Sequence, residues 1–124
     1  MTAEVLVFSR DPVLLETRRS ILEAFFHPRG AGNIEDAESE LAMDHFDLII
    51  LCSTLSEQEC ERVFELAEYQ KPRPQVLIMG IPGYDPPRYA ADHILMTESG
   101  PYQLLKRSAE ILGVDLRASG LVGV

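Results

Sequence analysis

A short apolar run near the middle of the chain, 47–51, constrains the fold more than any other feature. Its residues are rich in Leu and Ile, and the run ends abruptly in the small polar residues Ser53 and Thr54. A run this short and this apolar is typical of a strand buried on both faces, as in a parallel sheet covered by helices. Ligands gather beyond the carboxyl ends of such strands, so Cys52 stands where a functional group is expected.

Strand-like runs and amphipathic helical patterns alternate along the rest of the chain, which predicts a parallel sheet with helices on both faces. We expect strands at 4–9, 30–34, 47–51, 75–79 and 93–96, and helices at 12–26, 35–45, 56–69 and 101–112. About a dozen residues join the last two strands, near the lower limit for a helical crossover. Three prolines and two glycines stand in this connection. The helix that would cross over there is therefore expected to be short or missing.

Length and charge narrow the classes of function. The 124 residues suit one domain (1–124), with a core over 4–112 and a C-terminal tail over 113–124. A net charge of −9 argues against nucleic acid as the main partner, because binding phosphates needs clustered Lys and Arg. No apolar run approaches the ~20 residues that cross a bilayer, and no secretory signal is visible, so no membrane partner is expected. With two cysteines, too few for a disulfide framework, a reduced, cytoplasmic protein is expected.

Three segments together resemble the receiver domain of bacterial response regulators. The resemblance extends from Val5 to about Leu112 and implies a flavodoxin-like α/β fold with strand order 2-1-3-4-5. The segments are a strand-to-helix junction, the central apolar strand and the fourth predicted strand, at residues 5–12, 46–51 and 74–79.

The resemblance also implies a phosphorylation site, and this chain departs from it at every position. In the family, an Asp ending the third strand accepts a phosphoryl group and an acidic pair after the first strand holds Mg²⁺. A Thr or Ser after the fourth strand and a Lys after the fifth contact the phosphoryl group. The matching positions here are Cys52, then Ser9 and Arg10, then Gly80, and finally Thr97 or a direct neighbour. We therefore expect a degenerate pocket without metal, cofactor or catalytic activity.

The remaining polar residues of this pocket allow more than one interpretation. Asp11, just before Pro12, is better spaced to cap a helix than to bind a metal. Arg10 is either a resident cation in place of the metal or a solvated surface side chain. Cys52 is either a small buried residue or a reactive thiol whose pKa is lowered by helix N-termini and Arg10. A bond between Cys52 and Cys60 is not expected, because Cys60 should lie one turn into the next helix, facing the sheet.

Because this pocket lacks the residues for phosphoryl transfer, the domain would have to transmit a signal through a binding surface. We expect association through the side that lacks a full helix, with contacts at Tyr84, Ile94, Tyr102 and Leu105, unless the tail folds back to fill the gap. The predicted function is a receiver-like signalling domain that is not phosphorylated and binds a protein, either another signalling protein or a second copy. Two alternatives are a thiol-based redox sensor using Cys52 and the receiver-like part of a longer regulator with an output domain.

Overall fold

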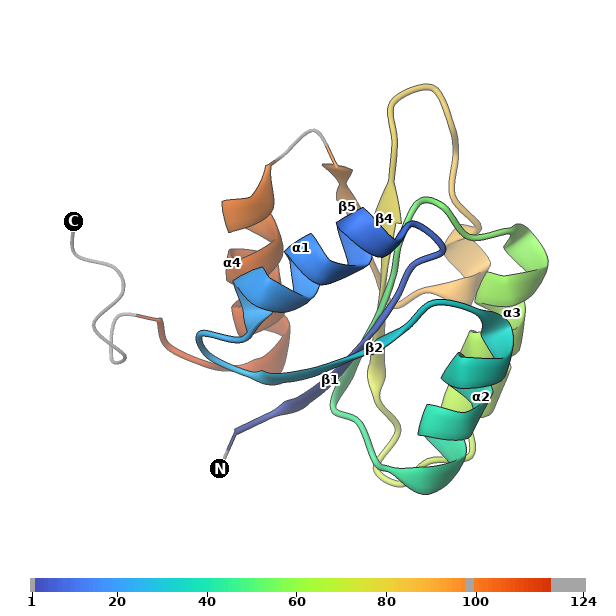
Figure 1. Cartoon of the computed structure of the whole chain (residues 1–124), viewed down its shortest axis with the longest axis horizontal. Coiled ribbons are helices and arrows are strands. Elements are labelled where there is room, and N and C mark those ends of the chain that lie inside the picture. The colour runs from blue at the N-terminus through green and yellow to red at the C-terminus, as the bar shows by residue number, and fades with distance from the viewer. Residues whose placement is uncertain (1, 98–99, 117–124) are drawn as a thin grey trace.

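The computed structural model of the chain describes residues 2–97 and 100–116 and shows the predicted parallel sheet (Figure 1). Five strands lie in the order β2-β1-β3-β4-β5, and every neighbouring pair is parallel. The flavodoxin-like fold class is thus confirmed. The strands are β1 (Glu4–Phe8), β2 (His27–Ala31), β3 (Leu48–Leu51), β4 (Gln75–Gly80) and β5 (His93–Met96). The helices are α1 (Pro12–Leu22), α2 (Ile34–Met43), α3 (Glu57–Ala67), the 3₁₀ turn η1 (Arg88–Ala90) and α4 (Pro101–Leu112).

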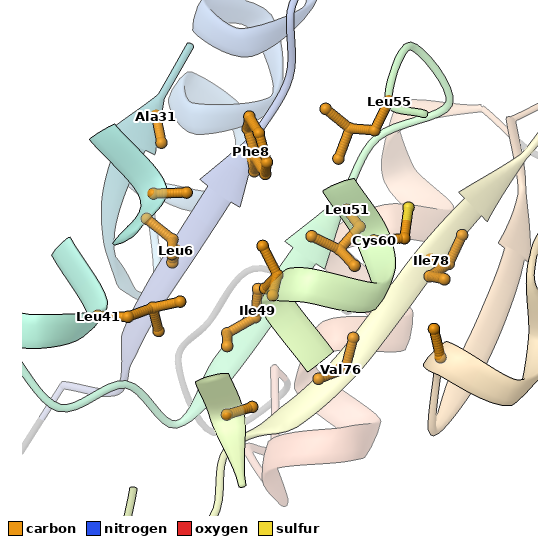
Figure 2. Packing of buried hydrophobic residues seen from close by; sticks show 14 of the residues in the cluster. Leu6, Phe8, Ala31, Leu41, Ile49, Leu51, Leu55, Cys60, Val76 and Ile78 are labelled. Atoms are coloured by element: carbon orange, nitrogen blue, oxygen red, sulfur yellow. The ribbon is translucent and has the colours of Figure 1, made fainter. Parts of the chain in front are cut away.

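The two faces of the sheet carry separate apolar cores. Alternate residues of β1 divide between them: Leu6 and Phe8 pack toward α2 and α3, whereas Val5 and Val7 pack toward α1 and α4. Figure 1 shows these helix pairs on opposite sides of the sheet. Figure 2 shows the first of these cores, in which side chains of β1, β3 and β4 meet α3 at Cys60. Because successive strand residues point to opposite faces, one continuous apolar run supplies both cores.

Short-range capping signals mark the starts of α1 and α3 and the end of α4 where the sequence places them. Asp11 accepts hydrogen bonds from the Val13 and Leu14 N–H groups, so its predicted capping role is confirmed. Ser56 and Glu59 form a reciprocal capping box at the start of α3. Gly113 ends α4 with φ of 70°, a left-handed conformation that favours glycine.

The second strand does not lie where the sequence predicts it. Instead of 30–34, β2 spans His27–Ala31, and α1 ends at Leu22 rather than at the predicted residue 26. Pro28 is not a helix stop here, because an edge strand tolerates proline. β2 is such an edge, pairing with β1 alone among the described strands, with Pro28 opposite Val5.

The shortened connection before β5 is confirmed. A loop and the single turn η1 replace a crossover helix, and Ala90 of η1 is buried in the core beside α3. The Tyr89 hydroxyl donates a hydrogen bond to the Glu57 carboxylate of α3. This contact ties the turn to α3 and closes part of the space that a helix would fill.

The described part of the C-terminal tail does not fill the gap beside η1. Leu116 is buried in the core beneath α1 and α4, and Val114 packs against the same cluster. That core lies on the opposite face of the sheet from Ala90. Residues 117–124 of the predicted tail lie outside the described residues. None of the described helices has the length and apolar character needed to cross a membrane.

Candidate functional site

The carboxyl ends of β1 and β3 bring the first two candidate residues together. Phe8 lies opposite Leu51, and the Cys52 N–H donates to the Phe8 carbonyl at 3.0 Å. Ser9 directly follows β1, and its hydroxyl lies close enough to the Cys52 thiol to lower the pKa of that thiol in part. The predicted meeting of the residues after these two strands is therefore observed.

A hydroxyl network ties the loop after β1 to the loop after β3. The Ser9 and Thr54 hydroxyl oxygens lie 3.2 Å apart, and Thr54 Oγ1 also accepts the Arg10 N–H at 3.0 Å. Ser9 Oγ in turn accepts the Asp11 N–H at 3.2 Å. From the sequence, Thr54 was expected only to end the strand. In the structure Thr54 holds the two loops together.

A charged pair closes the rim of this pocket. Arg10 Nε lies 2.9 Å from both carboxylate oxygens of Glu59, and Nη2 lies 2.7 Å from Oε2. Glu59 is 6% exposed and also accepts the Ser56 N–H of its capping box at 2.8 Å. Burial works against ionisation of Glu59, but hydrogen bonds from Arg10 and Ser56 hold its pKa below the ordinary value.

Arg10 therefore has features of both interpretations, because it is a cation with a carboxylate partner and its side chain is still largely exposed to solvent. Its side chain is 60% exposed, yet its guanidinium is bound edge-on to Glu59, which raises its pKa. Glu59 is a site residue that was not predicted from the sequence. The only signal was the spacing of Ser56 and Glu59, which predicts a capping box but does not indicate that its carboxylate reaches Arg10.

The thiol of Cys52 has an unexpected neighbour. Cys52 is 1% exposed, and burial raises its pKa, which the nearby Arg18 and Ser9 oppose in part. The basic neighbour is thus Arg18 of α1, and not Arg10 as the sequence suggested. Cys60 is free and lies in the core on the opposite face of the sheet, where burial raises its pKa to about 12. The expected absence of a bond between the two thiols is confirmed.

We predict slow alkylation of Cys52 in the native protein. A buried thiol of raised pKa offers little thiolate to iodoacetamide at neutral pH, so labelling should await opening of the fold. Mass spectrometry of a labelling time course, on the Cys60→Ser variant, measures this thiol alone. Labelling should reach the rate of a free cysteine once denaturant unfolds the protein. Fast native labelling together with a peroxide response would favour the sensor interpretation.

The last two pocket positions, Gly80 and Thr97, lie at the end of β4 and just after β5 and differ in their surroundings from Ser9, Arg10 and Cys52. Gly80 is buried at the end of β4, where an added Cβ would lie 3.0 Å from the Met96 sulfur and 3.4 Å from the Pro86 ring. The loop after β4 therefore packs against the place where the resemblance implies a hydroxyl side chain. Thr97 follows β5 and lines a cavity together with Arg18 of α1.

The chemistry of these positions does not fit a magnesium ion. Mg²⁺ requires hard oxygen ligands, usually including one or two carboxylates. Ser9, Arg10 and Cys52 offer a hydroxyl, a guanidinium and a thiol, and the nearby Glu59 carboxylate is already bound by Arg10. Over residues 2–97 and 100–116, no three His, Cys, Asp or Glu side chains are grouped to hold a metal.

The predicted contact residues have unequal exposure. Tyr84 and Tyr102 are 46% and 48% exposed, and Ile94 of the edge strand β5 is partly buried. Leu105 is 6% exposed and packs in the core beneath α1 and α4. Its place in the predicted contact surface is therefore wrong, because it lies on the inward face of α4.

Comparison with known proteins relates this architecture to solved structures. No protein-family model matches the chain, and no curated protein matches it. Among the similar solved structures, the BeF3-activated DrrB receiver domain of Thermotoga maritima is 19% identical, with 91% of this chain and 99% of that chain covered and a TM-score of 0.73. A CheY-like receiver domain protein of Methanospirillum hungatei is 19% identical over 91% and 95% of the two chains, with a TM-score of 0.74.

A third similar structure is the chemotaxis protein CheY4 of Vibrio cholerae. It is 17% identical to this chain, covering 90% of this chain and 99% of its own, with a TM-score of 0.73. At identities this low, the structural similarity shows the fold alone. The chemistry of the site has to be argued from the residues of this chain. The strand order, the near-complete coverage and these similarities together show that the chain has the fold of a CheY-like response-regulator receiver domain.

Proposed function

We propose that this protein is a receiver-like signalling domain that does not accept a phosphoryl group and acts by binding another protein. The observation that carries the proposal is the pairing of Arg10 with Glu59 at the pocket where the receiver chemistry needs free carboxylates. A thiol, Cys52, stands where an acceptor carboxylate is needed to form an acyl phosphate. In this proposal the domain signals by binding a protein at its surface, and not by a change in phosphorylation.

A titration with beryllofluoride and Mg²⁺ tests this proposal. We expect no saturable amide chemical-shift changes, because the pocket has neither the carboxylates that hold the metal nor the one that binds the phosphoryl mimic. Two-dimensional NMR of the uniformly labelled protein is the measurement, and beryllofluoride without Mg²⁺ is the control. Saturable, Mg²⁺-dependent shifts around Cys52 and Gly80 would contradict the proposal.

The proposed binding surface is the side of the domain bounded by the loop 81–87, β5 and the start of α4. β5 is an edge of the sheet, where unpaired backbone groups can meet another chain. Ile94 lies opposite Ile78, which faces the side where η1 stands in for a full helix. Tyr84 and Tyr102 border this region and are exposed, and tyrosine is enriched at protein interfaces.

Tyr102→Glu is expected to weaken association through this surface at least about tenfold, the effect of losing one interface anchor. The substitution places a carboxylate in the first turn of α4, where the helix dipole favours it, so the fold should persist. Sedimentation of the pure protein and partner capture from native cells are the measurements. Tyr69→Glu, at a tyrosine 77% exposed beyond the end of α3, is the matched control. A monomeric wild type whose Tyr102→Glu variant captures every native partner would exclude this surface.

The thiol-sensor interpretation has less support. A sensor cysteine needs exposure and a depressed pKa, whereas Cys52 is buried and its pKa is raised. The interpretation of the chain as the receiver-like part of a longer regulator is compatible with the proposed function, because an output domain would itself be a partner of this surface.

A further inference from the structure

A cavity of about 210 Å³ lies between α1 and α4, at the ends of β4 and β5. Its walls are mainly apolar: Leu14 and Ile21 come from α1, Met79 from β4, and Leu104 from α4. Arg18 of α1 lines the same cavity, together with Thr97. The cavity thus combines an apolar lining with one guanidinium, as small-molecule sites commonly do.

Arg18 is a buried cation with no carboxylate partner among residues 2–97 and 100–116. It is 8% exposed, and its Nη1 atom is buried with no hydrogen-bond partner. Within the described residues no carboxylate lies within ion-pair distance of it, and the buried Cys52 thiol, whose pKa burial raises, lies near it. Six other arginines each bind at least one carboxylate: Arg10, Arg19, Arg29, Arg62, Arg73 and Arg88. Burying an unpaired charge costs free energy, so an anion bound to Arg18 would stabilise this arrangement.

The start of α4 adds a second electropositive feature to the same cavity. Gly100 and Pro101 line the cavity and begin this helix of 12 residues. Within the described residues no side chain caps this helix, in contrast to α1, α2 and α3, and the Gln103 N–H donates to the Gly100 carbonyl instead. A helix N-terminus carries a partial positive charge that favours anions. Arg18 and this terminus therefore favour negative charge from two sides of one cavity.

The size of the cavity limits the ligand. An apolar cavity of about 150 Å³ accommodates a benzene molecule, whereas pockets for drug-sized ligands begin near 300 Å³. A volume of about 210 Å³ therefore suits a body the size of one ring or a short chain with a small charged group. A carboxylate suits Arg18 because its two oxygens match the fork of a guanidinium.

We propose that this cavity binds a small apolar monocarboxylic acid. The carboxylate lies on the Arg18 guanidinium, giving Nη1 the partner that it lacks. The apolar body packs against Leu14, Ile21, Met79 and Leu104. This ligand site shares the start of α4 with the protein-binding surface proposed above, but Arg18 lies on α1, outside that surface, and either proposal can fail without the other.

Benzoate and hexanoate are the probes, with benzamide as an uncharged isostere of benzoate and inorganic phosphate as an anion without an apolar body. NMR titration of the full chain should give saturable shifts of amides in α1 and the first turn of α4, with a Kd at or below about 1 mM for at least one acid. Benzamide should bind at least about tenfold more weakly than benzoate, because it lacks the charge-assisted hydrogen bonds. Phosphate should not saturate.

Arg18→Met keeps the length of the side chain and removes its charge. It should weaken benzoate at least about tenfold while leaving benzamide binding unchanged, which shows that the cavity is intact. Arg19→Met, at the neighbouring arginine that pairs with Glu16, is the matched control and should leave both unchanged. Equal affinities for benzoate and benzamide, no saturation by either acid up to about 10 mM, or an unaltered Arg18→Met variant would overturn the proposal.

A last variant distinguishes a ligand from a carboxylate of the chain itself. Glu98 follows Thr97 in the sequence and lies outside the described residues. Wild type and Glu98→Gln should bind benzoate within a factor of about two, since a free ligand needs no change in the chain. Binding that appears only in Glu98→Gln would assign the Arg18 partner to this chain and overturn the proposal.

Discussion

Phe8→Ala is expected to lower the free energy of unfolding by about 3–5 kcal/mol, the largest effect we predict for a single substitution. Phe8 is fully buried at the end of β1, between its register partners Ala31 on β2 and Leu51 on β3. Figure 2 shows its ring in the core on the α2 and α3 side of the sheet. Truncation removes the ring's burial and leaves a cavity that the surrounding strands cannot close.

Equilibrium unfolding in urea, with the slope unchanged, measures this loss. Tyr69→Ala is the matched control, because it also truncates an aromatic side chain, but one that is 77% exposed. The control should change stability by no more than about 0.5 kcal/mol. A Phe8→Ala loss below about 1 kcal/mol would mean that Phe8 is not part of a close-packed core.

Gly80→Thr is expected to destabilise the protein by about 1–3 kcal/mol, although it restores the residue type that the receiver resemblance implies at this position. An added Cβ would lie 3.0 Å from the Met96 sulfur and 3.4 Å from the Pro86 ring, and a threonine adds two more atoms. Met96 can yield, but Pro86 is buried and its ring is rigid. The shortened connection before β5 thus occupies the space of the missing hydroxyl.

Urea unfolding of this variant should be compared with Gly32→Thr, a control at an exposed glycine. A Cβ at Gly32 meets only one atom, the Ser9 carbonyl oxygen at 4.0 Å. Equal stability of the two variants, or a stabilised Gly80→Thr, would show that the loop after β4 can move away. The fold would then have room for a hydroxyl side chain at position 80, and the glycine there would not be required by packing.

The sequence predicted the elements whose signals are local. β5 and α4 have the predicted bounds, and Asp11 and Ser56 cap the helices they precede. These features depend on residues a few positions apart, such as a cap and the N–H groups it binds, or an alternation that separates two faces. β2 is the exception, since a proline acts differently at a sheet edge, and the position of an edge is a property of the whole sheet.

The sequence predicted which residues gather at the candidate site, but not which partners they contact. That Ser9, Arg10 and Cys52 gather at one edge follows from the order of parallel strands. The partner of Arg10 does not follow, because Glu59 is 49 residues away along the chain and meets Arg10 only when α3 packs beside the end of β1. The same holds for Arg18, whose position in a helical pattern does not predict that it is buried beside Cys52.

The alternation of strands and helices and the division of the strands between two buried faces could thus be predicted from the sequence, because both depend on residue type and short-range spacing. The strand order and the pocket positions followed from the resemblance to receiver domains. Only the tertiary structure decided how the charges are arranged. It paired Arg10 with Glu59, placed Arg18 in a cavity where no described carboxylate pairs with it, and packed Pro86 against Gly80. The physical reason is that pairing and burial of a charge depend on which elements pack together, and that packing is set by the core as a whole.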